Sequence, residues 1–145
     1  LMSTRLSPNF TFEELTISQT ASRLGLDNTP PSDVLEHLTS TALRMEAVRA
    51  LLMRPVLVSS GYRSPAVNAA VGGVPTSAHC QGWAVDFISP DFGDPFHICA
   101  AIAASPLEFD QVIQEGTWVH ISFAPTMRKQ CLTKTNGGYA TGIAA

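Results

Sequence analysis

The feature that most restricts the fold of this chain is the spacing of two histidines and one aspartate. His79 and Asp86 stand seven residues apart across Gly82, and His120 follows in a separate apolar segment. Two imidazoles and one carboxylate are a ligand set that a catalytic zinc ion accepts, with the fourth position left for water. We predict that these three side chains bind one Zn²⁺ ion, which requires a fold that brings two distant segments together.

The residues around these candidate ligands are apolar. Asp86 lies between Val85 and Phe87, in a run that is typical of a buried strand. A carboxylate buried there without a partner is costly, and a metal ion removes this difficulty. Cys80 is an alternative ligand beside His79. Neighbouring side chains in an extended or turning segment point apart, however, so we do not expect both to face one ion.

Apolar periodicity and turn residues predict an α+β fold. Thr11 and Glu14 match a capping box at the start of a first helix, and Pro55 ends a long second helix that Ser32 begins. The expected helices cover residues 11–25, 32–54 and 94–104, and the expected strands cover residues 56–59, 84–88, 109–113 and 118–123. We therefore expect a small antiparallel sheet of about four strands that carries the zinc site, flanked by about three helices.

Length and composition limit the class of protein. The 145 residues suit one domain, residues 1–145, in which residues 125–145 lack periodicity and are expected to form a loop-rich C-terminal tail. A hydrophobic content of 45% with 14% charged residues argues against disorder. A net charge of −3 without a basic run argues against nucleic-acid binding. No apolar run approaches the ~18 residues of a membrane span, and no signal segment is seen.

Three short motifs occur in a fixed order along the chain. They are Ser-Gly-Tyr-Arg-Ser at residues 60–64, Ser-x-His-x-x-Gly-x-Ala-x-Asp at residues 77–86 and Trp-x-His at residues 118–120. This pattern resembles the zinc D-alanyl-D-alanine carboxypeptidase and L-alanyl-D-glutamate peptidase family, which belongs with the hedgehog-like metallopeptidases. The resemblance runs from about residue 10 to about residue 123 and looks closest to the phage or prophage branch. It implies that His79, Asp86 and His120 hold the zinc ion.

The resemblance also implies roles in catalysis. Arg63 would hold a substrate carboxylate or stabilise the developing oxyanion, since a guanidinium suits either task. Many relatives place a glutamate three residues before the last histidine, where this chain has Thr117. Other relatives place the acid/base five residues before it, which is Glu115 here, and we favour Glu115. Asp110 is a second candidate for the base.

Four further residues are expected to bind substrate or support the site. We expect Asp110 and Gln111 to hydrogen-bond a ligand histidine from behind. Ser77 either orients a ligand, binds substrate or caps the turn, and Trp118 stands in the last motif beside His120.

The function implied by the resemblance is hydrolysis of an amide bond in the stem peptide of peptidoglycan. We expect a monomeric zinc peptidase, an endopeptidase or a D-Ala-D-Ala carboxypeptidase, that serves as a phage endolysin or tail-associated lysin. It would be made in the host cytoplasm and act in the periplasm or cell wall after release, or as part of the virion. The alternative is a non-catalytic zinc domain of the same fold that binds the wall or has a structural role, which Thr117 favours. A metal-free structural domain is a third possibility.

Overall fold

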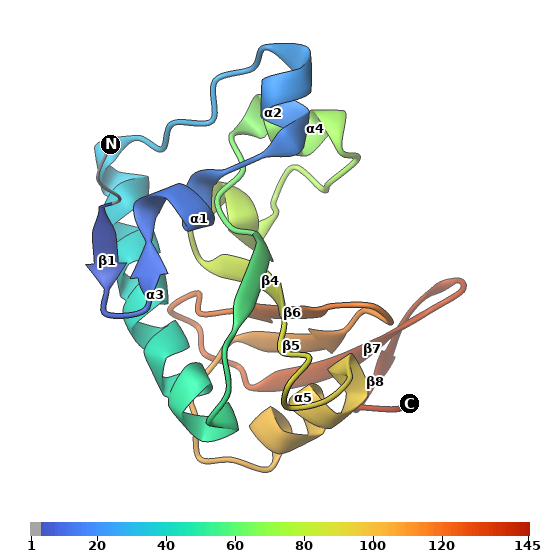
Figure 1. Ribbon diagram of the computed structural model, residues 1–145. Helices are drawn as coiled ribbons and strands as arrows, with labels where there is room; N and C mark the ends of the chain where they lie inside the picture. The colour runs from blue at the N-terminus through green and yellow to red at the C-terminus, as the bar shows by residue number, and fades with distance from the viewer. Residues whose placement is uncertain (1–3) are drawn as a thin grey trace.

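The computed structural model describes residues 4–145, which form an α+β fold with a six-stranded and a two-stranded sheet (Figure 1). The helices are α1 Phe12–Thr16, α2 Gln19–Leu24, α3 Ser32–Leu52, α4 Pro65–Ala70 and α5 Pro95–Ala103, with a short 3₁₀ helix, η1, at Ala78–Gln81. The strands are β1 Arg5–Ser7, β2 Phe10–Thr11, β3 Leu57–Ser60, β4 Ala84–Ile88, β5 Gln111–Gln114, β6 Val119–Ser122, β7 Gln130–Thr135 and β8 Gly138–Thr141.

The large sheet has the order β3-β4-β6-β5-β7-β8 and is antiparallel except for the parallel pair β5 and β7. The expected sheet of about four strands is therefore too small. The expectation of a loop-rich tail over residues 125–145 is also wrong, because the two additional strands β7 and β8 lie there. Asn136 and Gly137 make the turn between these strands, and Asn-Gly is a strong hairpin signal. The two strands were not predicted, because most of the residues on both of their faces are polar and no apolar alternation is visible in the sequence.

Five α-helices form within residues 4–145 where about three were expected, and α3 and α5 lie close to the expected residues. The Thr11 side chain accepts a hydrogen bond from the backbone N–H of Glu14, and the Glu14 carboxylate accepts one from the backbone N–H of Thr11. These two bonds complete the capping box. The helix then breaks, and Ser18 caps a separate α2 that ends at Gly25 in a left-handed conformation. The expected cap of α3 at Ser32 is wrong, because Pro31 holds that position and makes no side-chain hydrogen bond. The described residues contain no helix long and apolar enough to cross a membrane.

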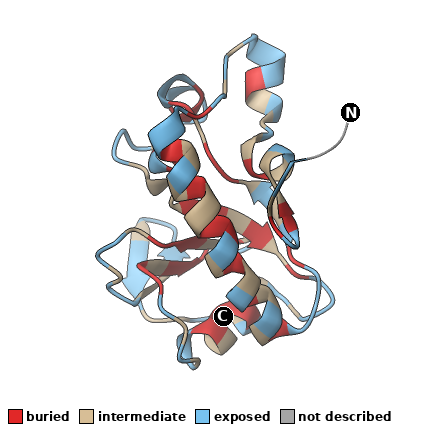
Figure 2. Cartoon of the chain, turned by 90° about the vertical axis from the view of Figure 1, so that its left-hand side faces the viewer, coloured by how far each residue is buried: buried red, intermediate tan, exposed pale blue. Residues whose placement is uncertain are grey.

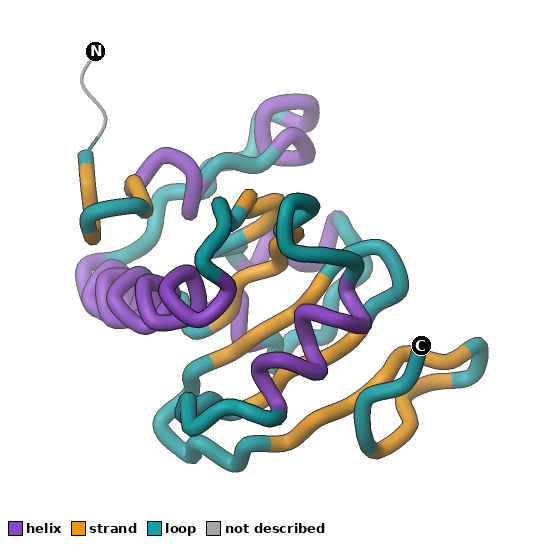
Figure 3. The backbone as a smooth tube through the Cα atoms, turned by 60° about the horizontal axis from the view of Figure 1, so that its bottom comes forward, coloured by secondary structure: helices purple, strands orange, loops and turns teal. Residues whose placement is uncertain are grey.

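One face of the large sheet is buried against helices α3 and α5. Alternate strand residues such as Val85, Phe87 and Ile121 are fully buried and join one apolar cluster with the inner side of α3. Figure 2 shows buried residues along one side of α3 and exposed ones along the other, and Figure 3 shows α5 lying across the strands. Because side chains alternate along a strand, the residues between these apolar ones must face the opposite side.

The opposite face of the sheet positions the candidate site. Strand register places Asp86 beside His120, His120 beside Ile113 and Ile113 beside Leu132. Directly opposed residues on neighbouring strands point to the same face, so this row crosses four strands on one side of the sheet. The polar face therefore carries two of the three candidate ligands on adjacent strands.

Candidate metal centre

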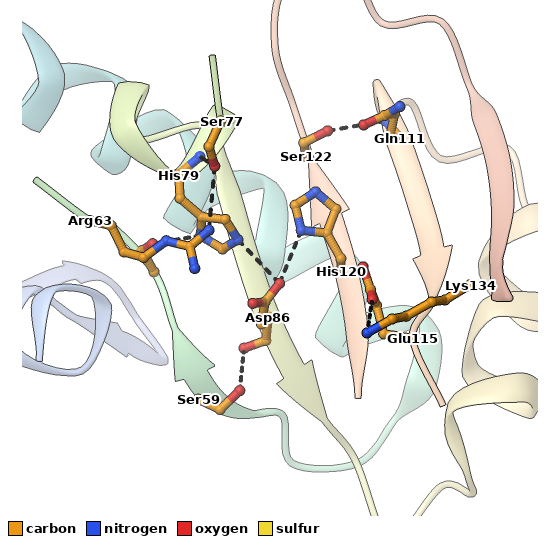
Figure 4. Close-up of polar contacts among 11 residues, drawn as sticks. Ser59, Arg63, Ser77, His79, Asp86, Gln111, Glu115, His120, Ser122 and Lys134 are labelled. Carbon is orange, nitrogen blue, oxygen red and sulfur yellow. Dashed lines mark hydrogen bonds and ion pairs between the residues drawn. The ribbon is translucent and has the colours of Figure 1, made fainter. Parts of the chain in front are cut away.

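The three candidate ligands converge on one point of the polar face. The Nε2 atom of His79 lies 3.2 Å from Oδ1 of Asp86, and Nδ1 of His120 lies 3.0 Å from the same oxygen (Figure 4). One ligand atom from each residue lies within 4.8 Å of the others. Among residues 4–145, this is the one group of histidine, cysteine, aspartate and glutamate side chains found at such spacing, and Cys80 is not part of it.

His79 reaches the sheet from η1, which ends in a tight turn. Gly82 has a φ of 76°, a left-handed conformation that costs glycine little. A Cβ atom at this position would also lie 2.8 Å from the carbonyl oxygen of Val34 on α3. Any other residue at position 82 would therefore strain the turn that joins His79 to β4, so glycine is required for both backbone conformation and packing.

The orientation of the His79 ring is held from behind. Its Nδ1 atom lies 2.7 Å from the carbonyl oxygen of Gly61, so Nδ1–H donates and the Nε2 lone pair faces Asp86. Gly61 in turn packs so closely against the backbone of Leu15 that a Cβ atom would clash. A backbone carbonyl that orients a histidine in this way is the support that metal-binding histidines ordinarily have.

Protonation states also suit a cation. Burial would raise the pKa of Asp86, but its close interactions with the His120 and His79 rings outweigh it and hold that pKa well below its usual range. Burial lowers the pKa of His79, which is only 2% exposed. A neutral imidazole and an ionised carboxylate are the forms that bind a metal ion. The donor set, its burial and its convergence therefore fit a zinc ion.

Arg63 lies beside His79, on the side away from His120 (Figure 4). Its Nη2 atom makes only a long 3.4 Å contact with Oγ of Ser77, and its buried Nε atom has no hydrogen-bond partner among the described residues. Ser77 accepts the backbone N–H of His79 and so caps η1. The structure thus shows Ser77 in its capping role, while Arg63 retains free donors beside the cleft.

Glu115 follows β5 and lies near His120 (Figure 4). Its side chain is 10% exposed, and its Oε2 atom lies 3.9 Å from Nζ of Lys134. Burial raises the pKa of Glu115, while the charges of His120 and Lys134 act in the opposite direction. The ammonium of Lys134 also lies 5.5 Å from the ring centroid of Trp118.

Asp110 and Gln111 were expected to hydrogen-bond a ligand histidine, and the structure contradicts this. Asp110 accepts hydrogen bonds from Thr126 and from the backbone and guanidinium of Arg128, at 2.7 to 3.1 Å. Gln111 donates to Gln130 at 2.6 Å. Neither forms a hydrogen bond to His79 or His120 in the part of the chain that the structure describes. Both residues instead fasten the segment that leads into β7.

The candidate ligands line an open cleft of about 930 Å³. Its walls include Arg63, Trp83, Glu115 and Trp118, together with residues of the 71–77 loop. Sequence reasoning missed several of the lining residues, among them Arg128, Leu132, Lys134 and Tyr139. The Asn-Gly turn was the signal that could have revealed Lys134 and Tyr139, because it brings these two residues into register as partners on β7 and β8.

Comparison with protein-family models identifies a match. A family model described as "Peptidase M15" matches residues 8–122, which is most of the chain and includes all three candidate ligands. The β7–β8 hairpin lies outside the matched residues. No curated protein matches the chain.

Proposed function

We propose that this chain, which belongs to the peptidase M15 family of zinc D-alanyl-D-alanine carboxypeptidase-like peptidases, hydrolyses an amide bond in the stem peptide of peptidoglycan. The observation that carries the proposal is the convergence of His79, Asp86 and His120 in an open cleft beside Arg63 and Glu115.

One zinc ion would be held by His79 Nε2, Asp86 Oδ1 and His120 Nδ1. When bound, zinc supplies a Lewis acid that acidifies water and polarises a carbonyl group. Glu115 takes the proton of the attacking water on a carboxylate oxygen and later delivers it to the leaving amine. The burial that raises the pKa of Glu115 suits a group that must both accept and release a proton.

Arg63 binds the substrate through its guanidinium, whose one hydrogen bond within residues 4–145 is the long contact with Ser77. Its guanidinium offers several N–H groups in one plane, which match a carboxylate or a developing oxyanion. The Nε atom is buried without a partner in the described residues, so a substrate oxygen placed there relieves an unsatisfied donor.

The cleft supports an endopeptidase over a carboxypeptidase. It extends from Arg63 and the 71–77 loop on one side of the candidate ligands to Lys134 and Tyr139 on the other. A cleft with walls on both sides of the reacting bond accommodates peptide on both sides. We propose a lytic role of the phage or prophage kind, as an endolysin that reaches the cell wall after release from the host cytoplasm or as a tail-associated lysin.

A second candidate is a non-catalytic zinc domain that binds the wall. Thr117 favours it, because many relatives carry the glutamate base at that position and threonine cannot accept a proton near neutral pH. This candidate keeps the metal and loses the chemistry.

Digestion of purified peptidoglycan separates the two candidates. The protein is first loaded with zinc until elemental analysis gives one ion per chain. The digestion products are then identified by mass spectrometry, and their masses show which bond is cut. A matched pair of variants is Glu115→Gln and Glu108→Gln, since Glu108 is an exposed glutamate whose side chain is 71% accessible. If the protein is an enzyme, peptides should be released by wild type and by Glu108→Gln. No peptides should be released in the presence of a chelator or by Glu115→Gln. One zinc per chain without any released peptide would favour the binding domain.

A further inference from the structure

The β7–β8 hairpin presents a cation and a phenol to the cleft. Lys134 and Tyr139 are register partners on β7 and β8, so their side chains share one face of the sheet. Lys134 stands two residues after Leu132, which belongs to the row that contains His120 and Asp86. Since alternate residues face the same side, Lys134 and Tyr139 face the same side as the candidate ligands, and both line the cleft.

The ammonium group of Lys134 can bind a further anionic group. Its side chain is 50% exposed, and its one ion pair in the described residues, with Glu115, is long at 3.9 Å. Arg128, the other cation in this part of the cleft, has its guanidinium committed to Asp110 through bonds of 2.8 Å. Partial burial and the charges of Glu115 and Asp86 raise the pKa of Tyr139, so its hydroxyl stays protonated and able to donate.

Arg63 and Lys134 lie on opposite sides of the candidate ligands. Figure 4 shows Arg63 on one side of Asp86 and Lys134 on the other. Arg63 follows β3 at one edge of the sheet, and Lys134 lies on β7, two strands beyond the β6 strand of His120. Two strand spacings amount to about 10 Å, which about three residues of extended peptide cover. A substrate bound across the cleft therefore meets one cation on each side of the reacting bond.

We propose that Lys134 and Tyr139 form a second carboxylate-binding subsite, which selects stem peptides with a free carboxylate on that side of the scissile bond over peptides amidated there. The inference rests on the proposed function and names its substrate class. Lys134 supplies the charge and Tyr139 donates a hydrogen bond to the same carboxylate. Amidation removes the negative charge, so only the free acid gains from Lys134.

The experiment uses synthetic stem peptides in two matched pairs. One pair differs at the α-carboxyl of D-glutamate, free or amidated, and the other at the side-chain carboxyl of diaminopimelate. We would measure kcat/KM for wild type, Lys134→Gln, Lys134→Arg and Tyr139→Phe. Lys129→Gln is the matched control, because Lys129 lies over the ring of Phe109 at 5.9 Å and does not line the cleft. Binding is measured separately on chelator-treated protein by tryptophan fluorescence, since both tryptophans line the cleft.

In one of the two pairs, wild type should prefer the free acid by about fivefold, the scale of a partly exposed ion pair. Lys134→Gln should reduce this preference below about twofold, Tyr139→Phe should reduce it less, and Lys134→Arg and Lys129→Gln should retain it. A rate loss in Lys134→Gln that is equal for acid and amide would mean that Lys134 acts through Glu115, and would overturn the subsite.

The two proposals fail in different ways. Cleavage by wild type without any acid preference in either pair would refute the subsite and leave the peptidase standing. Binding with an acid preference that depends on Lys134, but no cleavage of any peptide, would support the subsite and refute the peptidase. The subsite is also refuted if chelator-treated wild type binds the acid and the amide with the same affinity, as Lys134→Gln is expected to do. This holds whatever the cleavage rates are.

Discussion

Replacing Asp110 with asparagine should destabilise the protein at neutral pH. Asp110 is nearly buried and accepts four hydrogen bonds from Thr126 and Arg128, which fix the segment between β6 and β7. The bonds from Arg128 lower the pKa of Asp110 from 3.8 to about 2. At 1.36 kcal/mol per pH unit, this difference corresponds to roughly 2 kcal/mol of stability carried by the ionised carboxylate.

The pH dependence of this stabilisation has a definite sign. The folded-state pKa lies below the unfolded one, so the contribution is complete above about pH 4 and is lost as the pH falls towards about 2. Asp110→Asn removes a charged acceptor and should lack this part of the pH dependence. The variant should therefore lose roughly 2 kcal/mol at pH 7, and its difference from wild type should shrink between pH 4 and pH 2.

Urea unfolding followed by circular dichroism, at a series of pH values from 7 down to 2, measures this effect. Asp91→Asn is the matched control, because Asp91 is an exposed aspartate outside the cleft lining. The reasoning is refuted if Asp110→Asn unfolds at the same urea concentration as wild type at pH 7. It is equally refuted if a difference is present at pH 7 and does not narrow in acid.

The remaining predictions concern the candidate site. His120→Ala should abolish stoichiometric zinc binding, measured by elemental analysis, because it removes one of three converging donors. Adding zinc to metal-free wild type should raise its Tm, and the same addition should leave the Tm of His120→Ala unchanged. Glu115→Gln should lower kcat on peptidoglycan peptides by about 10²- to 10⁴-fold while zinc content stays at the wild-type level. Gly82→Ala should cost at least about 1 kcal/mol in urea unfolding, because the turn has a φ of 76° and a Cβ atom would lie 2.8 Å from the Val34 carbonyl oxygen.

The convergence of the candidate ligands was predictable because their segments have simple patterns. Asp86 and His120 are polar residues within short apolar runs, and such runs indicate neighbouring buried strands. Their register partnership follows from pairing β4 with β6. The position of His79 depended on Gly82, whose need for a left-handed turn can also be read from the chain. Their role as zinc ligands stays a prediction.

The role of Asp110 was not predictable, because its partners lie beyond the hairpin that it was expected to serve. A motif places an aspartate near a site but does not say whether it faces a histidine or an arginine. Arg128 follows a turn with no periodic pattern, and its pairing with Asp110 depends on the path of residues 124–129. Long-range partners of this kind are set by tertiary packing, which local spacing does not encode.

The same limit explains why β7 was missed. Its inward residues, Cys131 and Thr133, are small or polar, and its outward residue Lys134 faces the cleft, so hydrophobic alternation is weak. The strand joins β5 in parallel and so needs a crossover connection instead of a tight turn. Signals from turns could reveal the β7–β8 hairpin but not the strand beside which it lies.

The strand order separates two tasks within one sheet. The three candidate ligands lie on β4, β6 and η1, whereas the hairpin joins the sheet at the far edge of β5 and reaches the site through Lys134, which lies beside Glu115 and Trp118. Replacement of residues 130–141 by a hairpin of equal length should therefore keep the pairing of β4 with β6, while it changes the residues that face Glu115 and the far side of the cleft. Substitutions in this hairpin are thus expected to change the proposed carboxylate subsite while Asp86 and His120 stay in register.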